Sequence, residues 1–367
     1  MKFSPILLLG LTMLLTSCST VAPLFGKHKS AENAALPAKG QIKQVALLLP
    51  LKGGLAKKAE TVRDGFLASY YQAPGSLTIH VLDTPNANTA AIYDEAVSKG
   101  AHFVVGPLER DQVKSLVQRG RIPVATLTLN YTEGALPAHL YQFGLSPLDE
   151  ATQVAQRAWR EGHRKALIVV SGDNWGRRMG ATLTENWVHA GGTVVSTMTV
   201  SAKQNIVDQL HALVPSEDKS KLQSPPFDVV LLATLPGEAR SVVSMFRFYG
   251  LVQTPFYATS SIYSGVPSPA DKDLESVRIC DIPWVVNPTP EMVHATQQLR
   301  TLHPDIDLRL YALGVDAYRL IDELPVLASS SAATYAGLTG VLSLEGQRIK
   351  RVLAWGQFVN GQIVPLS

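Results

Sequence analysis

Short runs of apolar residues recur from residue 42 onward, and stretches with helical periodicity separate each run from the next. Continuous apolarity is what a strand buried on both faces requires, whereas a strand with one exposed face alternates. Repeated strand–helix units of about 25–30 residues form parallel sheets with right-handed crossovers. The pattern predicts an α/β fold, with strands at Val45–Leu49, Leu77–Leu82, His102–Gly106, Ile122–Leu129, Ala166–Val170, Thr193–Thr199 and Asp228–Ala233.

The number of these units predicts two lobes rather than one sheet. Turn residues and aromatics replace the alternation near 130–148, where we expect the chain to cross between lobes. We expect lobe 1 to begin with 42–145 and lobe 2 to occupy 146–258. Residues 259–345 are expected to return to lobe 1 and the hinge. Residues 346–367 are expected to form a hairpin on lobe 2 that turns at Asn360–Gly361.

The N-terminus has the features of a bacterial lipoprotein signal. Lys2 precedes an apolar stretch of roughly ten residues, which is too short to span a bilayer. The sequence Leu15-Thr16-Ser17-Cys18 is similar to a lipobox, so residues 1–17 are expected to be removed and Cys18 to carry the lipid. Residues 18–41 are expected to form a flexible tether, and Ser19 favours the outer membrane by resemblance to lipoprotein sorting. The alternative is an ordinary secretory signal with a chance cysteine.

Charge and cysteine content exclude several classes of protein. The formal net charge is +3 and only 17% of residues are charged, which argues against a strongly basic nucleic-acid binder. Two cysteines cannot build a disulfide framework or a structural zinc site. Cys280 lies in an apolar context that indicates a buried, inert thiol, with a reactive role as the alternative.

Motifs for catalysis are lacking in the sequence. There is no Walker A motif, nucleophile elbow, H-E-x-x-H or G-x-G-x-x-G, and no two histidines lie at helical i, i+4 spacing. Ser216 to Lys219 matches S-x-x-K in a polar loop and is read as chance. We therefore expect a protein that is not an enzyme, with no cofactor and no metal.

Polar and small residues follow several of the expected strands. In open α/β sheets ligands bind beyond the carboxyl ends of the strands, in a cleft between lobes. Such residues are therefore candidates for a polar, aromatic pocket, although caps and turns use the same residue types. The candidates are Gly106, Pro107 and Leu108, then Thr126, Thr128 and Asn130, then Asp173 and Trp175, and finally Ser260 and Tyr263.

Two α/β lobes joined by more than one crossing form the architecture of type I periplasmic binding proteins. The body also resembles the penicillin-binding-protein activator family of outer-membrane lipoproteins. The resemblance is specific where D-x-P-W at 281–284 occurs together with a C-terminal G-L-T-G and W-x-x-F-x-x-G at 337–361. Other matching stretches are VVGPLERDQV (104–113), GHRKALIVVSGDNWGRRMG (162–180), PFYATSSIYSG (255–265) and YALGVDAYRL (311–320).

What this resemblance implies is regulation of cell-wall synthesis. Family members stimulate a class A penicillin-binding protein, a peptidoglycan synthase, from the periplasmic face of the outer membrane. The best-known long members carry a helical-repeat domain before the binding fold, and here only the short tether precedes it. The main alternative is a lipoprotein that binds a small polar solute, an amino acid or a muropeptide-like molecule, in the cleft. A cell-wall hydrolase is the third reading, and the missing catalytic motifs speak against it.

Overall fold

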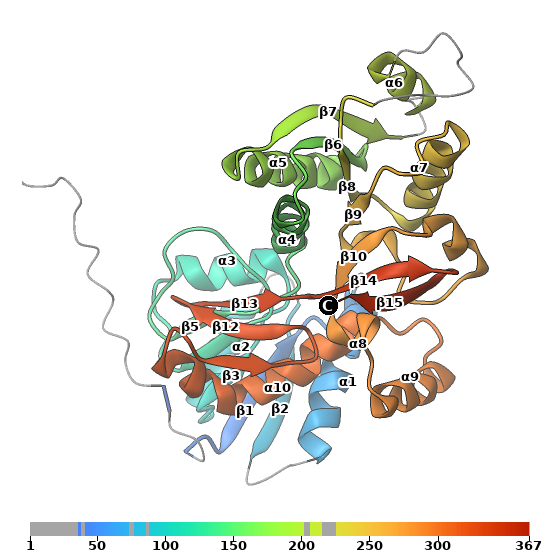
Figure 1. Ribbon diagram of the computed structural model, residues 1–367. Helices are drawn as coiled ribbons and strands as arrows, with labels where there is room; N and C mark the ends of the chain where they lie inside the picture. The colour runs from blue at the N-terminus through green and yellow to red at the C-terminus, as the bar shows by residue number, and fades with distance from the viewer. Residues whose placement is uncertain are drawn as a thin grey trace, which may run out of the picture.

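A computed structural model describes residues 36–37, 41–72, 77–85, 88–201, 206–214 and 225–366. The described chain builds two sheets with helices packed against them (Figure 1). The predicted α/β fold of two lobes is confirmed. All seven apolar runs singled out in the sequence contain strands.

The first sheet has eight strands in the order β11-β12-β13-β5-β4-β3-β1-β2. Strands β1 to β5 run parallel to their neighbours, and β11 to β13 form an antiparallel meander joined to β5. The bounds are β1 (Gln44–Leu49), β2 (Thr78–Asp83), β3 (Phe103–Val105), β4 (Ala125–Thr128), β5 (Leu140–Gln142), β11 (Thr334–Ala336), β12 (Val341–Glu345) and β13 (Arg348–Val352).

The second sheet has seven strands in the order β15-β14-β10-β9-β8-β6-β7. Five of them are parallel, and β14 and β15 add an antiparallel hairpin beside β10. The bounds are β6 (Lys165–Ser171), β7 (Thr193–Val200), β8 (Val229–Ala233), β9 (Phe256–Ala258), β10 (Arg278–Asp281), β14 (Ala354–Val359) and β15 (Gln362–Leu366).

Helices cover both faces of each sheet. In β1, Val45 and Leu47 pack in a core with α1 and α10, while Ala46 and Leu48 pack in a second core with α2 and α3. This explains why the strand is apolar at every position. The helices are α1 (Ala56–Gln72), α2 (Thr89–Ser98), α3 (Arg110–Gln118), α4 (Pro147–Arg160), α5 (Asn174–His189), α6 (Ile206–Leu213), α7 (Pro236–Phe248), η1 (Ser260–Ile262), η2 (Pro269–Leu274), α8 (Pro283–Val286), α9 (Pro290–Leu302) and α10 (Leu308–Ser329).

In its described part, the chain passes between the sheets three times. The first passage joins β5 to α4, inside the segment expected from the sequence. The second leads from β10 and α8 to α10, and the third is Leu353 between β13 and β14. Figure 1 shows these passages side by side between the two lobes.

Two expected boundaries differ from the sheet order. Residues 259–345 were assigned to lobe 1 and the hinge, but β10 pairs with β9 and β14 in the second sheet. Residues 346–367 were assigned to a hairpin on lobe 2, but β13 pairs with β12 and β5 in the first sheet. The reason is long-range pairing, which local sequence does not encode. Residues 351–359 form one mostly apolar stretch, yet Leu353 divides it between two sheets.

The C-terminal hairpin itself forms where the sequence predicts it. Val359 pairs with Gln362, and Asn360 and Gly361 between them have φ of 53° and 79°. A two-residue hairpin turn of this kind requires positive φ at both central residues, which Asn-Gly tolerates.

Candidate functional site

A cavity of about 380 Å³ lies between the two lobes, at the carboxyl ends of β4, β5 and β6. We call it the interlobe cavity. Lobe 1 and the first passage contribute most of its wall, and lobe 2 contributes the start of α5. It is lined by Arg110, Asn130, Tyr131, Thr132, Glu133, Leu145, Ser146, Pro147, Leu148, Asp149, Trp175, Arg178, Met179 and Arg348.

Three helices begin at this cavity, since α3, α4 and α5 each place a residue of the first turn on its wall. The first turns of α4 and α5 are capped by side chains. Ser146 Oγ accepts a hydrogen bond from the Asp149 amide at 3.2 Å, and Asp173 Oδ1 accepts one from the Gly176 amide at 2.7 Å. Capping explains why the sequence starts its helices at these polar residues.

Arginine side chains dominate the charge of the interlobe cavity. Arg348 is fixed by bonds to the Thr132 carbonyl at 3.0 Å and Gln142 Oε1 at 3.3 Å, and its guanidinium lies 5.2 Å from the centre of the Tyr131 ring. Tyr131 donates its hydroxyl to the Ile349 carbonyl at 2.8 Å. Burial raises the pKa of Tyr131 to about 12, so this phenol remains a neutral donor.

Three of the sequence candidates lie at this cavity or beside it. Asn130 and Trp175 line the interlobe cavity. Leu108 lies in an adjoining cavity of about 290 Å³ that also includes Asn130, and its carbonyl accepts the Asn130 side-chain amide at 3.0 Å.

Gly106 and Pro107 do not line the interlobe cavity. Their turn instead contacts the backbone of neighbouring strands in the first sheet. Gly106 has φ of +100°, and a Cβ there would lie 2.1 Å from the Leu48 carbonyl oxygen, so only glycine fits. Pro107 accepts a hydrogen bond from the Leu129 amide at 2.9 Å. The turn is therefore a close backbone contact between neighbouring strands.

Thr126 and Thr128 are fully buried in β4. Thr126 Oγ1 donates to the Val124 carbonyl at 2.9 Å and lies 3.0 Å from the Tyr93 hydroxyl. Thr128 Oγ1 donates to the Asn130 carbonyl at 3.0 Å. Both hydroxyls are used within the lobe, and neither lines the described cavities.

The remaining candidates, Asp173, Ser260 and Tyr263, make contacts within the protein. Asp173 is exposed and caps α5. Ser260 and Tyr263 lie at the second sheet, where their carbonyl oxygens accept hydrogen bonds from Arg309 Nη2 at 3.2 and 3.1 Å. Tyr263 packs its ring against Phe358 at 5.8 Å.

A polar cluster at the hinge was not anticipated from the sequence. Arg309, at the start of α10, binds Asp281, at the end of β10, with Nε 2.9 and 3.1 Å from the two carboxylate oxygens. Asp281 is buried, and the Arg309 side chain is only 17% exposed. The pair joins the second sheet to the helix that returns to lobe 1, and the only sequence signal was the aspartate of the D-x-P-W motif.

Glu150 and Arg351 complete this hinge cluster. Glu150, in the first turn of α4, is buried and accepts hydrogen bonds from the Ser260 hydroxyl at 2.7 Å and the Ser260 amide at 3.2 Å. Burial raises the pKa of Glu150, and the positive charge of Arg351 opposes that rise. Gln153 fixes the third passage, with bonds to the Arg351 carbonyl at 3.1 Å and the Leu353 amide at 2.9 Å.

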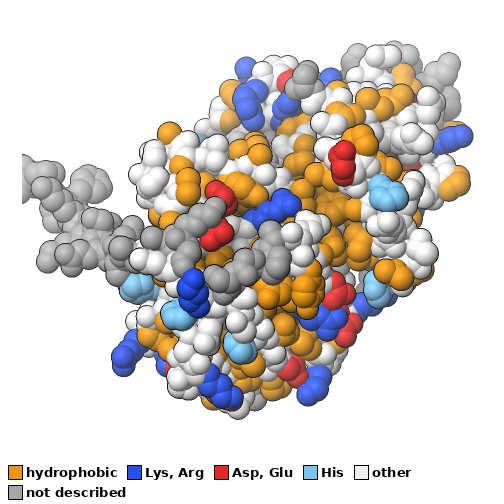
Figure 2. All heavy atoms as spheres, turned by 90° about the horizontal axis from the view of Figure 1, so that it is seen from below, with side chains coloured by type: hydrophobic (Ala, Val, Ile, Leu, Met, Phe, Trp, Pro, Cys, Tyr) orange, Lys and Arg blue, Asp and Glu red, His pale blue; other side chains and the backbone are white. Residues whose placement is uncertain are grey.

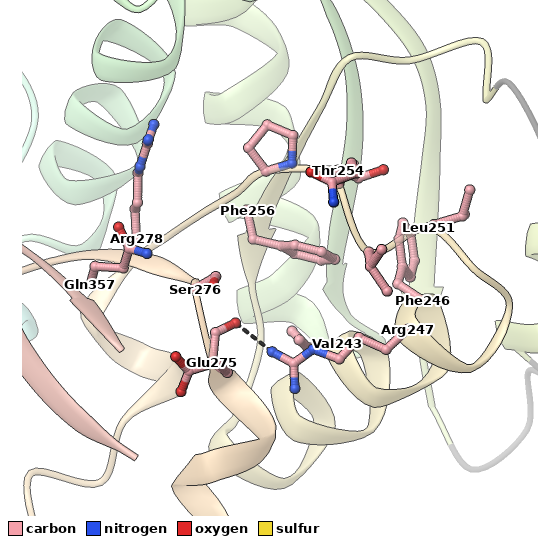
Figure 3. A pocket seen from close by; sticks show the side chains of 13 residues that line it. Val243, Phe246, Arg247, Leu251, Thr254, Phe256, Glu275, Ser276, Arg278 and Gln357 are labelled. Atoms are coloured by element: carbon pink, nitrogen blue, oxygen red, sulfur yellow. Dashed lines mark hydrogen bonds between the residues drawn. The ribbon is translucent and has the colours of Figure 1, made fainter. Parts of the chain in front are cut away.

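A second cavity, of about 410 Å³, lies at the amino ends of β9 and β10 (Figure 3). Its two arginines are engaged by the protein. Arg247 donates to the carbonyls of Asp273 and Glu275, and Arg278 contacts Glu161 and the Tyr257 hydroxyl. Because both guanidinium groups are already hydrogen-bonded by the protein, and Arg278 is also paired with Glu161, the interlobe cavity is the stronger candidate for ligand binding.

The described residues contain neither a membrane-spanning helix nor a metal site. Across the helices that the structure describes, none combines the length and apolar character needed to cross a bilayer. Within the described ranges, no three His, Cys, Asp or Glu side chains are grouped in a way that would hold a metal ion. Cys18, the expected lipid attachment residue, lies outside the described residues.

The two sheets, their three passages and the cavity between them define a two-lobed protein of the type I periplasmic-binding class. A solute-binding protein of an ABC transporter from R. palustris shares this fold, with a TM-score of 0.57, 17% identity and coverage of 89% of this chain and 96% of that one. More specifically, the family model for the LppC putative lipoprotein matches residues 35–361, and the chain belongs to this family.

Named relatives agree with that assignment. Penicillin-binding protein activator LpoA of Photobacterium profundum is 27% identical over 353 residues, covering 89% of this chain and 57% of the relative. The LpoA C-domain of Haemophilus influenzae, described as a regulator of PBP1A, superposes with a TM-score of 0.74 at 24% identity and covers 88% of this chain and all of that one. This chain thus spans little more than half the length of the curated relative.

Proposed function

We propose that this chain is an outer-membrane lipoprotein that binds a class A penicillin-binding protein and activates its peptidoglycan synthesis. The observation that carries the proposal is the family match over residues 35–361 together with a relative named as a penicillin-binding protein activator. The solved C-domain, all of which aligns with 88% of this chain, is described as a regulator of PBP1A.

The anchor in this proposal is Cys18, lipidated after removal of residues 1–17. Two or more acyl chains hold a protein stably at a membrane, whereas one binds marginally. The tether from Ser19 to Gln41 would reach at most about 80 Å when fully extended. As a flexible coil it would average about 25–30 Å. The anchored body is therefore expected to work near the inner leaflet of the outer membrane.

A regulatory rather than catalytic role agrees with the finding that the charged side chains at the hinge are already bound to other protein groups. At the hinge, Arg309 is paired with Asp281, and Glu150 is hydrogen-bonded to Ser260. Such engaged groups fix the position of the two lobes instead of offering a free acid or base. A non-enzymatic binding partner is the role we propose.

A protein partner requires an accessible contact area. Figure 2 shows hydrophobic side chains gathered in the hollowed middle of one face, with lysine and arginine side chains mainly toward its margins. Apolar areas of this kind, rimmed by polar residues, are typical of protein contact surfaces. We include this face among the surfaces on which the synthase is expected to bind.

The test is a glycan polymerisation assay with a purified class A synthase from the same envelope. Addition of the lipidated full-length chain is expected to raise the polymerisation rate, and cross-linked membranes are expected to yield a complex of the two proteins. The matched control is Cys18→Ser, which should retain stimulation in detergent and lose it in cells. An unchanged rate together with no cross-linked synthase would refute the proposal.

A further inference from the structure

A corner of lobe 2 that is rich in basic side chains lies where α4 ends and β6 begins, at the amino end of the second sheet. The interlobe cavity lies at the carboxyl end of β6, so a seven-residue strand, roughly 20 Å long, separates the two places. Among the described residues, five basic side chains meet two acidic ones here. We call this surface the basic corner, and it consists of Arg157, Arg160, Arg164, Lys165 and Arg278 with Glu161 and Asp228.

Glu161 is the central acid of the basic corner, and the protein already uses its charge. Arg157 and Arg278 both pair with it. Its carboxylate also accepts a hydrogen bond from the Tyr257 hydroxyl. Burial acts to raise the pKa of Glu161, but the bonds from Tyr257 and Arg157 lower it overall, so the carboxylate stays ionised at neutral pH. Two of the five basic side chains therefore share one acid.

The other three basic side chains form no ion pair with the described residues. They are Arg160, Arg164 and Lys165, and all three are exposed. Asp228 does not pair with them, because its carboxylate accepts the backbone amides of Arg164 and Lys165 at 3.0–3.1 Å. His163 lies 3.9 Å from Asp228, and burial lowers the pKa of this imidazole, so it is neutral at pH 7. Positive charge is thus in excess at this surface.

Arg164 is fixed over an aromatic ring. Its guanidinium carbon lies 3.7 Å from the centre of the Trp159 ring, and Nη1 donates to the carbonyls of Trp159 and His163 at 3.0 and 2.7 Å. Trp159 is only partly buried, and a Cβ on Gly191 would lie 3.4 Å from it. Tryptophan and arginine are enriched among the residues that dominate protein interfaces. A side chain that is already held in place loses less conformational entropy when a partner binds.

We propose that the basic corner binds an acidic segment of the synthase, with carboxylates on the three unpaired basic side chains and an apolar side chain against Trp159. The inference rests on the proposed function, because it names the surface and the chemistry through which that partner is held. Charge complementarity selects an acidic partner. Arginine in particular presents paired donors that match a carboxylate.

The position of the basic corner favours a protein over the anchoring membrane. The described chain enters lobe 1 at β1, whereas the basic corner belongs to lobe 2. Figure 1 shows β1 low in lobe 1, far from α4 and β6 in the upper half of the view. The surface therefore lies on the lobe that the anchored end of the chain does not enter first, where it is open to a partner in the periplasm.

The experiment measures binding of a purified class A synthase to the full-length chain in detergent, on an optical biosensor. The double variant Arg160→Glu with Arg164→Glu is expected to weaken binding about tenfold or more, mainly through slower association. Wild-type binding should weaken as salt rises, and the double variant should depend less on salt. The matched control is Lys114→Glu with Arg121→Glu, which makes the same change of net charge at exposed positions of lobe 1 and should bind like the wild type.

Thermal unfolding of both double variants should resemble that of the wild type, since all four side chains are exposed. Wild-type protein that binds the synthase as tightly as the Arg160 and Arg164 double variant does, or without dependence on salt, would overturn the proposal and leave the proposed function standing. Equal weakening by the control would also overturn it, because net charge alone would then explain the effect.

Two further outcomes separate this inference from its alternatives. A wild-type chain that binds no synthase would refute the proposed function, and the inference would fail with it. The other outcome concerns the Cys18→Ser chain, which lacks the lipid. If it binds phosphatidylglycerol vesicles through Arg160 and Arg164 while the synthase ignores both residues, the basic corner contacts a membrane and the proposal is wrong.

Discussion

Gly65 of α1 and Gly314 of α10 allow the backbones of the two helices to touch. A Cβ at Gly65 would lie 2.0 Å from the Tyr311 carbonyl oxygen, and a Cβ at Gly314 would lie 2.0 Å from the Val62 carbonyl oxygen. The contact is reciprocal, since each glycine meets the helix that carries the other. It sets how closely α10, the helix that returns from the second sheet, packs against lobe 1.

We therefore expect Gly314→Ala to destabilise the protein by about 1–3 kcal/mol or more, since backbone atoms cannot yield as a side chain does. Gly237→Ala on α7 is the matched control, because nothing lies within 4 Å of its added Cβ. That control should be neutral or stabilising by up to about 1 kcal/mol. Urea unfolding of both variants checks the prediction, and equal midpoints would contradict it.

The buried pair of Arg309 and Asp281 predicts a large loss of stability when one partner is removed. Asp281→Asn should cost about 3–5 kcal/mol, because the Arg309 charge is then left buried without its counter-ion. The exposed pair of Lys57 and Asp305, 3.5 Å apart, provides the control, and Asp305→Asn should cost about 0–1 kcal/mol.

Replacing both members of the buried pair separates pairing from packing. The double variant Asp281→Leu with Arg309→Met should recover much of the loss, because no unpaired charge remains. Denaturant unfolding of the single and double variants measures the difference. A double variant less stable than Asp281→Asn would show that the hydrogen bonds from Arg309 to the Ser260 and Tyr263 carbonyls matter more than the charge.

The burial of Glu150 is expected to make the free energy of unfolding depend on pH. Burial raises the pKa of its carboxyl in the folded state, so the folded protein holds this proton more tightly than the unfolded chain does. This contribution to the free energy of unfolding is full below the unfolded pKa of 4.5 and is lost as pH rises through the folded pKa.

The variant Glu150→Gln keeps acceptors for the Ser260 bonds but cannot ionise. Its stability relative to the wild type should therefore increase as pH rises from about 4 to about 8. Urea unfolding across this range checks it, with Glu60→Gln on the exposed side of α1 as the control for the substitution itself. A constant difference between Glu150→Gln and the wild type would contradict the burial argument.

We expect the thiol of Cys280 to be unreactive in the folded protein. It is fully buried, and burial together with the nearby Glu150 carboxyl raises the pKa of its thiol well above the ordinary value. Because the thiolate is the reactive form, native protein should not react with a disulfide reagent, whereas unfolded protein should. Ser241→Cys, at an exposed position of α7, gives the reactive control. Rapid labelling of native Cys280 would refute the prediction.

Much of the fold could be read from local sequence because its strands are buried on both faces. Continuous runs such as Val45–Leu49 leave no register in which one side faces water, so strand, parallel sheet and two lobes follow together. Likewise Asn360–Gly361 fixes its own turn through backbone conformation. These features depend on residues close together in the chain.

The boundaries and the site depended on contacts between distant residues. Leu353 divides a mostly apolar stretch between two sheets, because β13 pairs with β5 and β14 pairs with β10. The residues next to Leu353 do not specify these partners. Arg178 and Arg348 are 170 positions apart in the chain and line one cavity only after both lobes have folded. The sequence alone thus determined the elements and the class of fold. Tertiary structure decided which charges face the cavity and which are paired at the hinge, because pairing of distant charges is set by packing rather than by local propensity.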